Sequence, residues 1–528
     1  MPEQESFDVI VVGYGPTGLV ASSLLARLGH HVGVFERWPD LYGLPRLVNL
    51  DAEAARIVQA AGDIDVALRE STQFTRYFFR NAAGDTLLEL DWAGFGVCGF
   101  PEHLSMYQPH VEDAIDAAAR ERGAVVRQGI QVVAVEQDDD GVTVTHRPRD
   151  GGPEGTARAK WLIGADGANS TIRTLLGVER QDLGMRSAFL NLDTIRRRPL
   201  EGTDSYRFDA PIVVCAPPRM HVIVPIGERR LRLELEVLDG DDRDELLKPE
   251  SAWRFLREWH QLGPDDVEVY RQVIYEFDSQ LALRWRTGRI LLAGDAAHQM
   301  SPFIGQGACS GMRDAINLAW RLDLMLRGVS ADRLIDGYEI ERTPHVTAQI
   351  MISAGLGRMA TERDPAKAQE RDQAFLRGNA AGAPPDVVLT DGVLHRDGDG
   401  QPALLAGRLG PQGIVSHNGH QGRGDDVLGW GFTLLCRGMG PLAALNDGHR
   451  SFLERIGAHV VALTEERATN LVRDVDGSYT RFFDEHGVVA LLVRPDFNIF
   501  GAARETAEVA VLLDDLRAQL AVTEERVG

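Results

Sequence analysis

Apolar runs and a helical repeat alternate at the start of this chain. Residues 7–13 form a continuous apolar run, and residues 32–36 form a second one, as expected for strands that are buried on both faces of a parallel sheet. The leucines of residues 16–28 fall near helical spacing. The pattern predicts strand, helix and strand, which is a βαβ unit.

The middle of the chain has a different pattern of apolar and polar positions. Residues 181–275 contain stretches that alternate between apolar and polar positions, which predicts antiparallel strands with one solvated face. The run at 290–293 again resembles a buried strand, and residues 310–328 form an amphipathic helical pattern. A further helix is predicted from about 332 towards 359, where Pro344 is expected to interrupt or kink it.

Composition narrows the class of protein. The 528 residues carry a net charge of −22, so nucleic acid and anionic membranes are poor partners. We see no apolar run of membrane-spanning length and no signal-peptide pattern. The four cysteines form no CxxC pair, which disfavours a redox dithiol or a zinc finger and makes the cytoplasm the simplest location.

A glycine motif follows the first predicted strand. Gly13, Gly15 and Gly18 form GxGxxG where that strand meets the helix, which is the context of the dinucleotide fingerprint. Such glycines let the backbone approach a pyrophosphate at the helix N-terminus. Glu36 ends the second strand, where a carboxylate accepts hydrogen bonds from ribose hydroxyls. We therefore predict a bound dinucleotide.

Two later strand ends also place an aspartate beside glycine. Asp166 lies in GADGANS, and Gly294 and Asp295 lie in LAGDAAH, which runs on to the glycine-rich residues 302–307. An aspartate there suits the hydroxyls of a flavin's ribityl chain. Taken singly, each motif also fits an acidic turn that caps a helix.

Together, GYGPTG…ER, GADGANSTIR and GDAAHQMSPFIGQG resemble the group A FAD-dependent aromatic hydroxylases. The chain is most similar to 3-(3-hydroxyphenyl)propionate hydroxylases and related phenol and polyketide hydroxylases. This resemblance implies an α/β fold: a Rossmann-like FAD-binding domain, an inserted antiparallel β-sheet substrate domain and a C-terminal thioredoxin-like domain lacking CxxC. The expected bounds are 1–75, 100–180 and 276–360 for the first, 76–99 and 181–275 for the second, 361–400 for a linker and 401–528 for the third.

The resemblance also implies a set of FAD-binding residues. They are Gly13, Gly15, Gly18, Glu36, Arg37, Arg46, Gln108, Asp166, Gly294, Asp295, Pro302, Gly305, Gly307, Ala308 and Cys309. Two departures stand out. Ala308 and Cys309 occupy positions where relatives often carry Asn, and Asn49 stands where relatives often carry Gly or His.

The implied activity is hydroxylation of a phenolic substrate, ortho to an existing hydroxyl, through a flavin hydroperoxide. NADH or NADPH would be a transient co-substrate and O2 the oxidant, with no metal. The alternatives are a polyketide-tailoring hydroxylase or epoxidase, a flavin reductase, and a flavin-holding scaffold protein. A homodimer is left open.

Candidate substrate residues lie on the predicted antiparallel strands. Arg219, His221 and Arg232 could face a substrate, and an arginine could bind a carboxylate through two hydrogen bonds. A solvated, charged sheet face is the more common origin of such a pattern. Phe303 fits a pocket wall or core packing equally well. His298 is interpreted as packed or hydrogen-bonded rather than catalytic.

Overall fold

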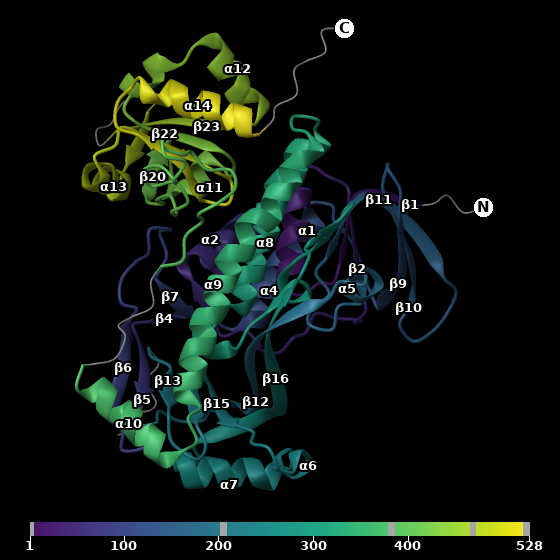
Figure 1. Cartoon of the computed structure of the whole chain (residues 1–528), viewed down its shortest axis with the longest axis vertical. Helices are drawn as coiled ribbons and strands as arrows, with labels where there is room; N and C mark the ends of the chain where they lie inside the picture. Colours follow the sequence, from purple (N-terminus) through teal and green to yellow (C-terminus); the bar gives the residue numbers. More distant parts are fainter. Residues whose placement is uncertain (1–4, 201–208, 379–385, 465–470, 521–528) are drawn as a thin grey trace.

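The computed structural model describes residues 5–200, 209–378, 386–464 and 471–520. The molecule has three parts, each built on a large sheet (Figure 1). The predicted α/β fold class is confirmed.

The first part is the predicted FAD-binding domain. Its eight-stranded sheet has the order β17-β18-β11-β1-β2-β8, with β10 and β9 added beside β11. The core strands β18, β11, β1, β2 and β8 pair in parallel. The strands are β1 (Glu5–Val12), β2 (Val32–Glu36), β8 (Val125–Gln128), β9 (Ile130–Gln137), β10 (Val142–Pro148), β11 (Gly155–Gly164), β17 (Arg286–Thr287) and β18 (Ile290–Leu292).

Helices pack around this sheet because the packing buries their apolar faces. They are α1 (Pro16–Arg27), α2 (Ala52–Ala61), α3 (Ile64–Ala67), α4 (Gln108–Glu121), α5 (Thr171–Leu175), α8 (Gly307–Leu326) and α9 (Asp336–Ala360), with short turns η2 (Gly294–Ala296), η3 (Pro302–Ile304) and η4 (Asp332–Ile335). A small sheet of β3 (Asn49–Asp51), β7 (His103–Ser105) and β4 (Thr72–Phe74) lies beside them.

The α9 helix passes through Pro344 without interruption, so the expected break is absent. Its neighbours Glu341 and Arg342 are buried and bonded to Arg494 and Asp314. This packing holds the helix in the turn before the proline and outweighs the local cost.

The second sheet has the order β19-β16-β12-β15-β14-β13-β5-β6. All its pairs are antiparallel except that of β13 with β5. Its strands are β5 (Arg76–Arg80), β6 (Thr86–Asp91), β12 (Arg180–Arg196), β13 (Ile212–Val214), β14 (His221–Ile226), β15 (Arg230–Glu236), β16 (Val267–Ala282) and β19 (His298–Gln299), with α6 (Arg243–Leu246) and α7 (Pro249–His260) nearby.

The predicted linker, 361–400, contains a helix, α10 (Pro365–Leu376). Arg371 of this helix donates to the carbonyl oxygens of Met359 and Cys215. The first part of this segment is therefore packed against the second sheet, and residues 379–385 lie outside the described residues.

The C-terminal part has a seven-stranded sheet in the order β21-β20-β24-β23-β22-β25-β26. Its elements are β20 (Ile414–His417), β21 (His420–Arg423), α11 (Gly424–Leu428), β22 (Thr433–Arg437), η5 (Gly440–Ala444), α12 (Asp447–Arg455), β23 (His459–Thr464), β24 (Val472–Asp474), α13 (Ser478–His486), β25 (Ala490–Val493), β26 (Ile499–Ala503) and α14 (Glu508–Gln519).

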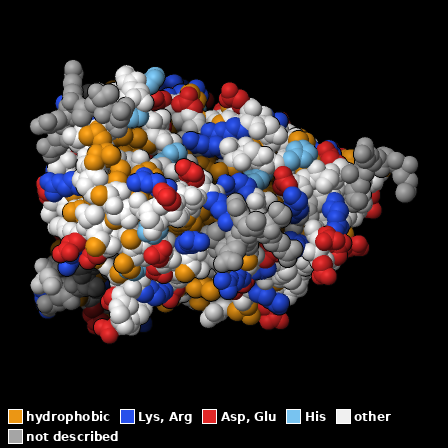
Figure 2. All heavy atoms as spheres, turned by 90° about the horizontal axis from the view of Figure 1, so that it is seen from above, with side chains coloured by type: hydrophobic (Ala, Val, Ile, Leu, Met, Phe, Trp, Pro, Cys, Tyr) orange, Lys and Arg blue, Asp and Glu red, His pale blue; other side chains and the backbone are white. Residues whose placement is uncertain are grey.

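Surface charge and helix hydrophobicity bear on which partners the protein can bind. Seen from above, basic and acidic side chains are interspersed over the visible face (Figure 2). Among the described residues, no helix combines the length and apolarity that crossing a membrane requires.

Candidate functional site

The three glycine-rich motifs meet at one edge of the first sheet. They follow β1, β11 and β18, which are adjacent parallel strands whose carboxyl ends share that edge. Ala165 N donates to Val12 O at 2.8 Å, and Ala293 N donates to Gly164 O at 3.0 Å. A Cβ on Gly13, which has a φ of +98°, would overlap the backbone of Ala165. The motifs are therefore in backbone contact, which only glycine permits at this position.

Thr17 joins the first motif to the third. A Cβ added to Gly294 or Gly311 would collide with the Thr17 hydroxyl. This close packing brings the start of α1 against both η2 and α8.

Arg173 joins the second motif to the third. Its guanidinium donates to Ala168 O at 2.8 Å and to Ala296 O at 2.9 Å. The side chain is 6% exposed, so these hydrogen bonds are shielded from water. Arg173 therefore fixes the separation of the two loops.

Two helices begin at these loops with glycine-rich, uncapped ends. The N-cap of α1 is Gly15 and that of α8 is Gln306, neither of which caps its helix with its side chain, and neither helix has an acidic residue in its first turn. Open space surrounds the position where Gly15 would carry a Cβ. The first-turn N–H groups lack intrahelical partners, so both ends suit anionic or electron-rich cofactor atoms.

Asp295 follows β18 and lies in η2, at the same edge of the sheet. Its side chain is exposed although Gly294 and Ala296 on either side are buried. Surrounding protein nevertheless raises the pKa of Asp295 through burial, while His298, Arg46 and Arg173 act to lower it. A carboxylate open to water yet ringed by protein fits a site for a polar, hydroxyl-bearing chain.

Glu36 and Asp166 make backbone contacts in this structure. Glu36 accepts hydrogen bonds from Tyr14 N at 2.7 Å and from Trp38 N at 2.8 Å, which ties the glycine turn to the end of β2. Asp166 accepts from the first backbone N–H groups of α5, at 2.7 and 3.1 Å. The capping interpretation thus describes Asp166, and its predicted FAD contact stays a prediction. Arg37 is exposed beside Glu36.

A clamp formed around residues 45–47 joins the two large domains. Gln108 Oε1 accepts hydrogen bonds from the backbone N–H groups of residues 46 and 47, each at 2.7 Å. On the other side, Arg232 donates to carbonyl oxygens 45 and 46 at 2.5 and 2.8 Å, and Arg271 donates to carbonyl 45 at 2.7 Å. Both arginines pair with the fully buried Asp193.

This clamp gives Arg232 partners other than the predicted substrate. The side chain is 3% exposed and is committed to Asp193 and to the backbone. Arg219 pairs with Asp241 at 2.7 Å. His221 packs against Trp259 and His260 at the end of β14 away from the clamp. The structure does not bring Arg219 and His221 into contact with the motif loops.

Phe303 lies in η3, within the third loop (residues 294–307), and Cys309 lies in the first turn of α8. Phe303 is buried against Phe189, and its carbonyl accepts from the Tyr77 hydroxyl at 2.8 Å. Cys309 Sγ lies 3.8 Å from the carbonyl oxygens of Asn49 and Gly305. Burial raises the pKa of the Cys309 thiol to about 12, so it packs as a neutral group.

His298 is buried and bonded to Asp314 at 2.6 Å. Asp314 also accepts from Gly294 N and from Arg342, each at 2.9 Å. The contacts agree with a hydrogen-bonded, structural His298, whose partner Asp314 holds the turn at Gly294. No group of three or more His, Cys, Asp or Glu side chains within the described ranges is arranged for a metal.

Sequence reasoning missed the arginines that hold the loops in place. Arg313 and Arg271 bond groups far away in sequence, so the motif spacing gave no signal for them. Arg232, which was predicted to face a substrate, bonds the backbone of residues 45 and 46 instead. A charged residue within an otherwise apolar strand or helix was the available hint, because buried charges need partners.

The site fits FAD: two uncapped helix ends, glycines in backbone contact and an exposed carboxylate lie near one edge of the first sheet. Residues 6–353 match the family described as FAD binding domain, and residues 407–519 match the HcaD C-terminal domain. The chain therefore belongs to the FAD-binding-domain family of flavoprotein monooxygenases, and its cofactor is FAD. The resemblance noted in the sequence is confirmed.

Two named proteins of the family are similar to this chain over most of their length. The chain is 36% identical to a probable NADH-specific resorcinol 4-hydroxylase of Rhodococcus jostii (strain RHA1), over 98% of this chain and 96% of the relative. It is 29% identical to a 3-(3-hydroxy-phenyl)propionate/3-hydroxycinnamic acid hydroxylase of Comamonas testosteroni, over 93% of each.

Solved structures share the whole fold. The flavin-dependent monooxygenase PieE, in complex with FAD and substrate, matches with a TM-score of 0.81 at 23% identity, over 98% of this chain and 99% of PieE. Aklavinone-11 hydroxylase, in a ternary complex with FAD and aklavinone, matches with a TM-score of 0.77 at 24% identity, over 99% and 100%.

Proposed function

We propose that this protein uses NADH and O2 to hydroxylate a monocyclic phenol that carries a second substituent meta to its hydroxyl. The single observation that carries the proposal is the full-length 36% identity to a protein named as an NADH-specific resorcinol hydroxylase. Resorcinol and 3-(3-hydroxyphenyl)propionate share this meta arrangement, which places an electron-rich carbon ortho to a phenol hydroxyl.

Bound FAD would accept electrons from the nicotinamide and activate O2 for insertion into the ring. The residues proposed to hold it are those of the three loops. Gly13, Gly15 and the start of α1 would bind the pyrophosphate, and Asp295 would accept hydrogen bonds from the ribityl hydroxyls. Glycines 305 and 307 would lie along the flavin ring.

The protein would orient the reacting ring and exclude water from it. Phe303, Phe189 and Tyr77 form a buried apolar cluster directly behind the third loop. Such a wall excludes water from the side of the loop that faces the second sheet. We infer that the phenol binds between this loop and that sheet.

The charges of the second sheet favour an uncharged diol over a phenolic acid. Arg219 and Arg232, the arginines predicted to hold a substrate carboxylate, each already pair with an aspartate. A resorcinol-type substrate needs no such cation. This supports resorcinol ahead of the phenylpropionate.

The test is a screen of substrate-stimulated NADH oxidation with purified, FAD-loaded protein. Resorcinol, 3-(3-hydroxyphenyl)propionate and a polycyclic phenol are compared, with product mass measured for each. We expect resorcinol to stimulate NADH oxidation most and to gain one oxygen atom. Fast NADH oxidation without substrate, yielding only peroxide, would contradict the proposal.

A polyketide hydroxylase is the second candidate, because the full-length fold matches aklavinone-11 hydroxylase. Stimulation by the polycyclic phenol alone would favour it.

A further inference from the structure

A buried ring of side chains lies behind the third loop. Arg313, on α8, donates to Gln306 Oε1 at 2.8 Å and to Asp51 Oδ2 at 2.6 Å, and it also pairs with Glu53. Gln306 Nε2 donates to the same Asp51 oxygen at 2.8 Å, which closes the ring. Arg313 and Gln306 are 7% and 6% exposed, so water competes little for these charge-assisted hydrogen bonds.

Gln306 is the residue through which this ring reaches the cofactor loop. It stands between Gly305, which has a φ of +64°, and Gly307, the first residue of α8. Because its side chain is turned towards Arg313 and Asp51, it does not cap α8. The orientation of this peptide, and of the first N–H groups of α8, therefore depends on a contact made seven residues further along the helix.

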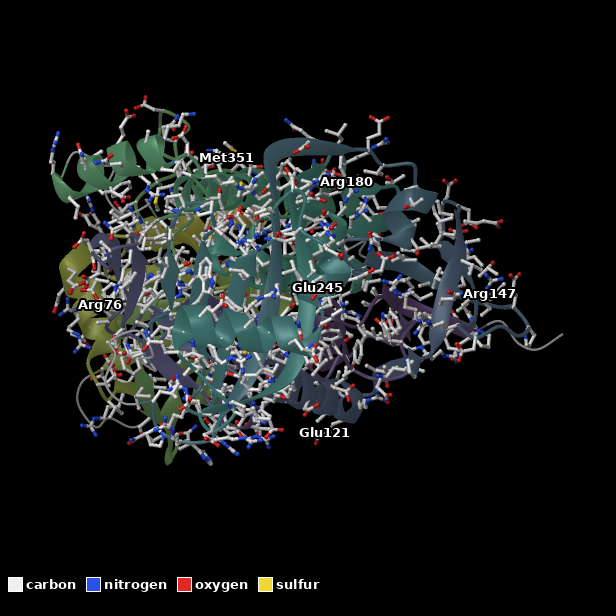
Figure 3. The ribbon with its side chains drawn as sticks, turned by 90° about the horizontal axis from the view of Figure 1, so that it is seen from below. Arg76, Glu121, Arg147, Arg180, Glu245 and Met351 are labelled. Carbon is white, nitrogen blue, oxygen red and sulfur yellow. The ribbon has the colours of Figure 1, made fainter. Side chains whose placement is uncertain are left out.

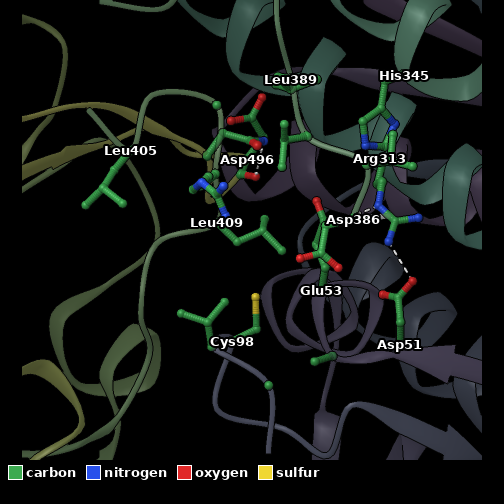
Figure 4. A pocket seen from close by; sticks show the side chains of 18 of the residues that line it. Asp51, Glu53, Cys98, Arg313, His345, Asp386, Leu389, Leu405, Leu409 and Asp496 are labelled. Carbon is green, nitrogen blue, oxygen red and sulfur yellow. Dashed lines mark hydrogen bonds and ion pairs between the residues drawn. The ribbon is translucent and has the colours of Figure 1, made fainter. Parts of the chain in front are cut away.

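The other side of Arg313 faces a cavity of about 370 Å³ where the FAD-binding and C-terminal domains meet (Figure 4). Asp51, Glu53 and Arg313 form part of its wall, and Leu389, Leu405 and Leu409 belong to the same lining. In Figure 4 the Arg313 guanidinium is joined to the Asp51 carboxylate across this edge. Shortening Arg313 would enlarge this cavity rather than create a clash.

We propose that Arg313 is a positioning residue for the flavin: it acts through Gln306 and Asp51 to hold residues 305–309 in the shape that binds the flavin ring. The inference rests on the proposed placement of the ring at this loop. It assigns Arg313 no contact with FAD or substrate. It also assigns a purpose to a buried arginine whose two carboxylate partners come from β3 and α2, more than 250 residues earlier.

The cavity makes chemical rescue possible. In Arg313→Ala, the space left by the side chain would open into the cavity, and added ethylguanidinium could reoccupy the guanidinium position. We measure the dissociation constant of FAD from the full-length protein by flavin fluorescence, together with the visible spectrum of the bound flavin. We expect the FAD dissociation constant to rise about tenfold, the effect of losing roughly one charge-assisted hydrogen bond, and to recover with ethylguanidinium.

Two controls separate positioning from general destabilisation. Tetramethylammonium chloride matches the ionic strength but donates no N–H, so it should not restore FAD binding. Arg321 lies on the same helix, is fully buried and pairs with Glu341, but it does not line the cavity. Arg321→Ala should lower the melting temperature without recovery of FAD affinity on adding ethylguanidinium.

A conservative variant keeps the test decisive if Arg313→Ala does not fold. Arg313→Lys retains the charge but cannot reach Asp51, Glu53 and Gln306 together. It should fold and still bind FAD more weakly than the wild type. Wild-type FAD affinity in Arg313→Lys, or equal losses at Arg313 and Arg321 with no rescue, would overturn the proposal. Absence of phenol turnover by the wild type would overturn the proposed function alone.

Discussion

At the scale of single residues, Asp166, Asp295 and Asp314 differ in the donors that already reach their carboxylates. Asp166 and Asp314 are saturated by backbone and side-chain donors, whereas Asp295 remains open to water between buried neighbours. Asp166 and Asp295 each stand beside a glycine after a buried strand, yet their contacts differ. The difference arises from the donors that each fold environment supplies.

Asp295→Ala should weaken FAD binding by about tenfold or more, because a carboxylate that accepts ribityl hydrogen bonds contributes roughly 1.5–3 kcal/mol. The measurement is the FAD dissociation constant by fluorescence. Asp278→Ala is a suitable control, since that carboxylate pairs with an exposed arginine on the second sheet. Equal affinity in Asp295→Ala and wild type would remove Asp295 from the cofactor site.

Glu112 gives a prediction about pH. Its Oε1 accepts from Gln108 at 2.7 Å, its Oε2 is buried with no partner among the described residues, and burial raises its pKa from 4.5 to about 7. Between pH 4.5 and about 7, Glu112 is deprotonated in the unfolded chain but still protonated in the folded protein. The folded state therefore loses stability as the pH rises through this range. Glu112→Gln should therefore gain stability relative to wild type, by up to about 3 kcal/mol above pH 7.

Urea unfolding at pH 5 and pH 8 measures this difference. Glu121→Gln is the matched control, because Glu121 is exposed on the same helix (Figure 3). A wild-type-like pH dependence in Glu112→Gln would show that the buried carboxyl does not control stability in this range.

At the scale of elements, the three loops depend on one another more than on their own sequences. Parallel pairing of β1, β11 and β18, which come from distant parts of the chain, places them at one edge, and Arg173 then bridges two of them. The glycine turn is in turn tied to β2 through Glu36. The site is therefore a product of strand order, with arginines setting the spacing of its loops.

Arg173→Lys should loosen the second and third loops, since a lysine cannot reach Ala168 O and Ala296 O with the geometry of a guanidinium. We expect FAD affinity to fall about tenfold, with a smaller change in melting temperature. Arg180→Lys serves as comparison, because Arg180 is exposed and bonds only a glutamine side chain among its described contacts. Identical FAD affinity in both variants would contradict the bridging role.

At the scale of the molecule, the C-terminal part is locked to the FAD-binding domain by buried charge. Arg494 bonds Glu341 of α9 at 2.7 and 3.0 Å and Asp496 at 2.5 and 3.0 Å. Asn317 and Trp320 of α8 also bond Asp496. Since α8 begins at the cofactor loop, the C-terminal part supports the helix that carries the site.

Arg494→Met should cost about 3–5 kcal/mol in unfolding free energy, because it leaves two carboxylates with too few partners in a dry interface. Denaturant unfolding measures this cost. Arg437→Met provides the comparison, since its ion pair with Asp484 is about half exposed and should contribute less than about 1 kcal/mol. Similar stabilities of the two variants would mean that the junction is not a strong clamp.

Local sequence is enough to specify the buried parallel strands, the glycine turns and the order of the three motifs. These follow from nearest-neighbour sterics and from hydrophobic periodicity, which act over a few residues. The tertiary structure brings Arg232, Arg313 and Arg494 to Pro45, Asp51 and Glu341, which lie about 150 to 260 residues away from them. A buried arginine requires an acceptor, but only the packing of distant elements determines which acceptor comes within reach.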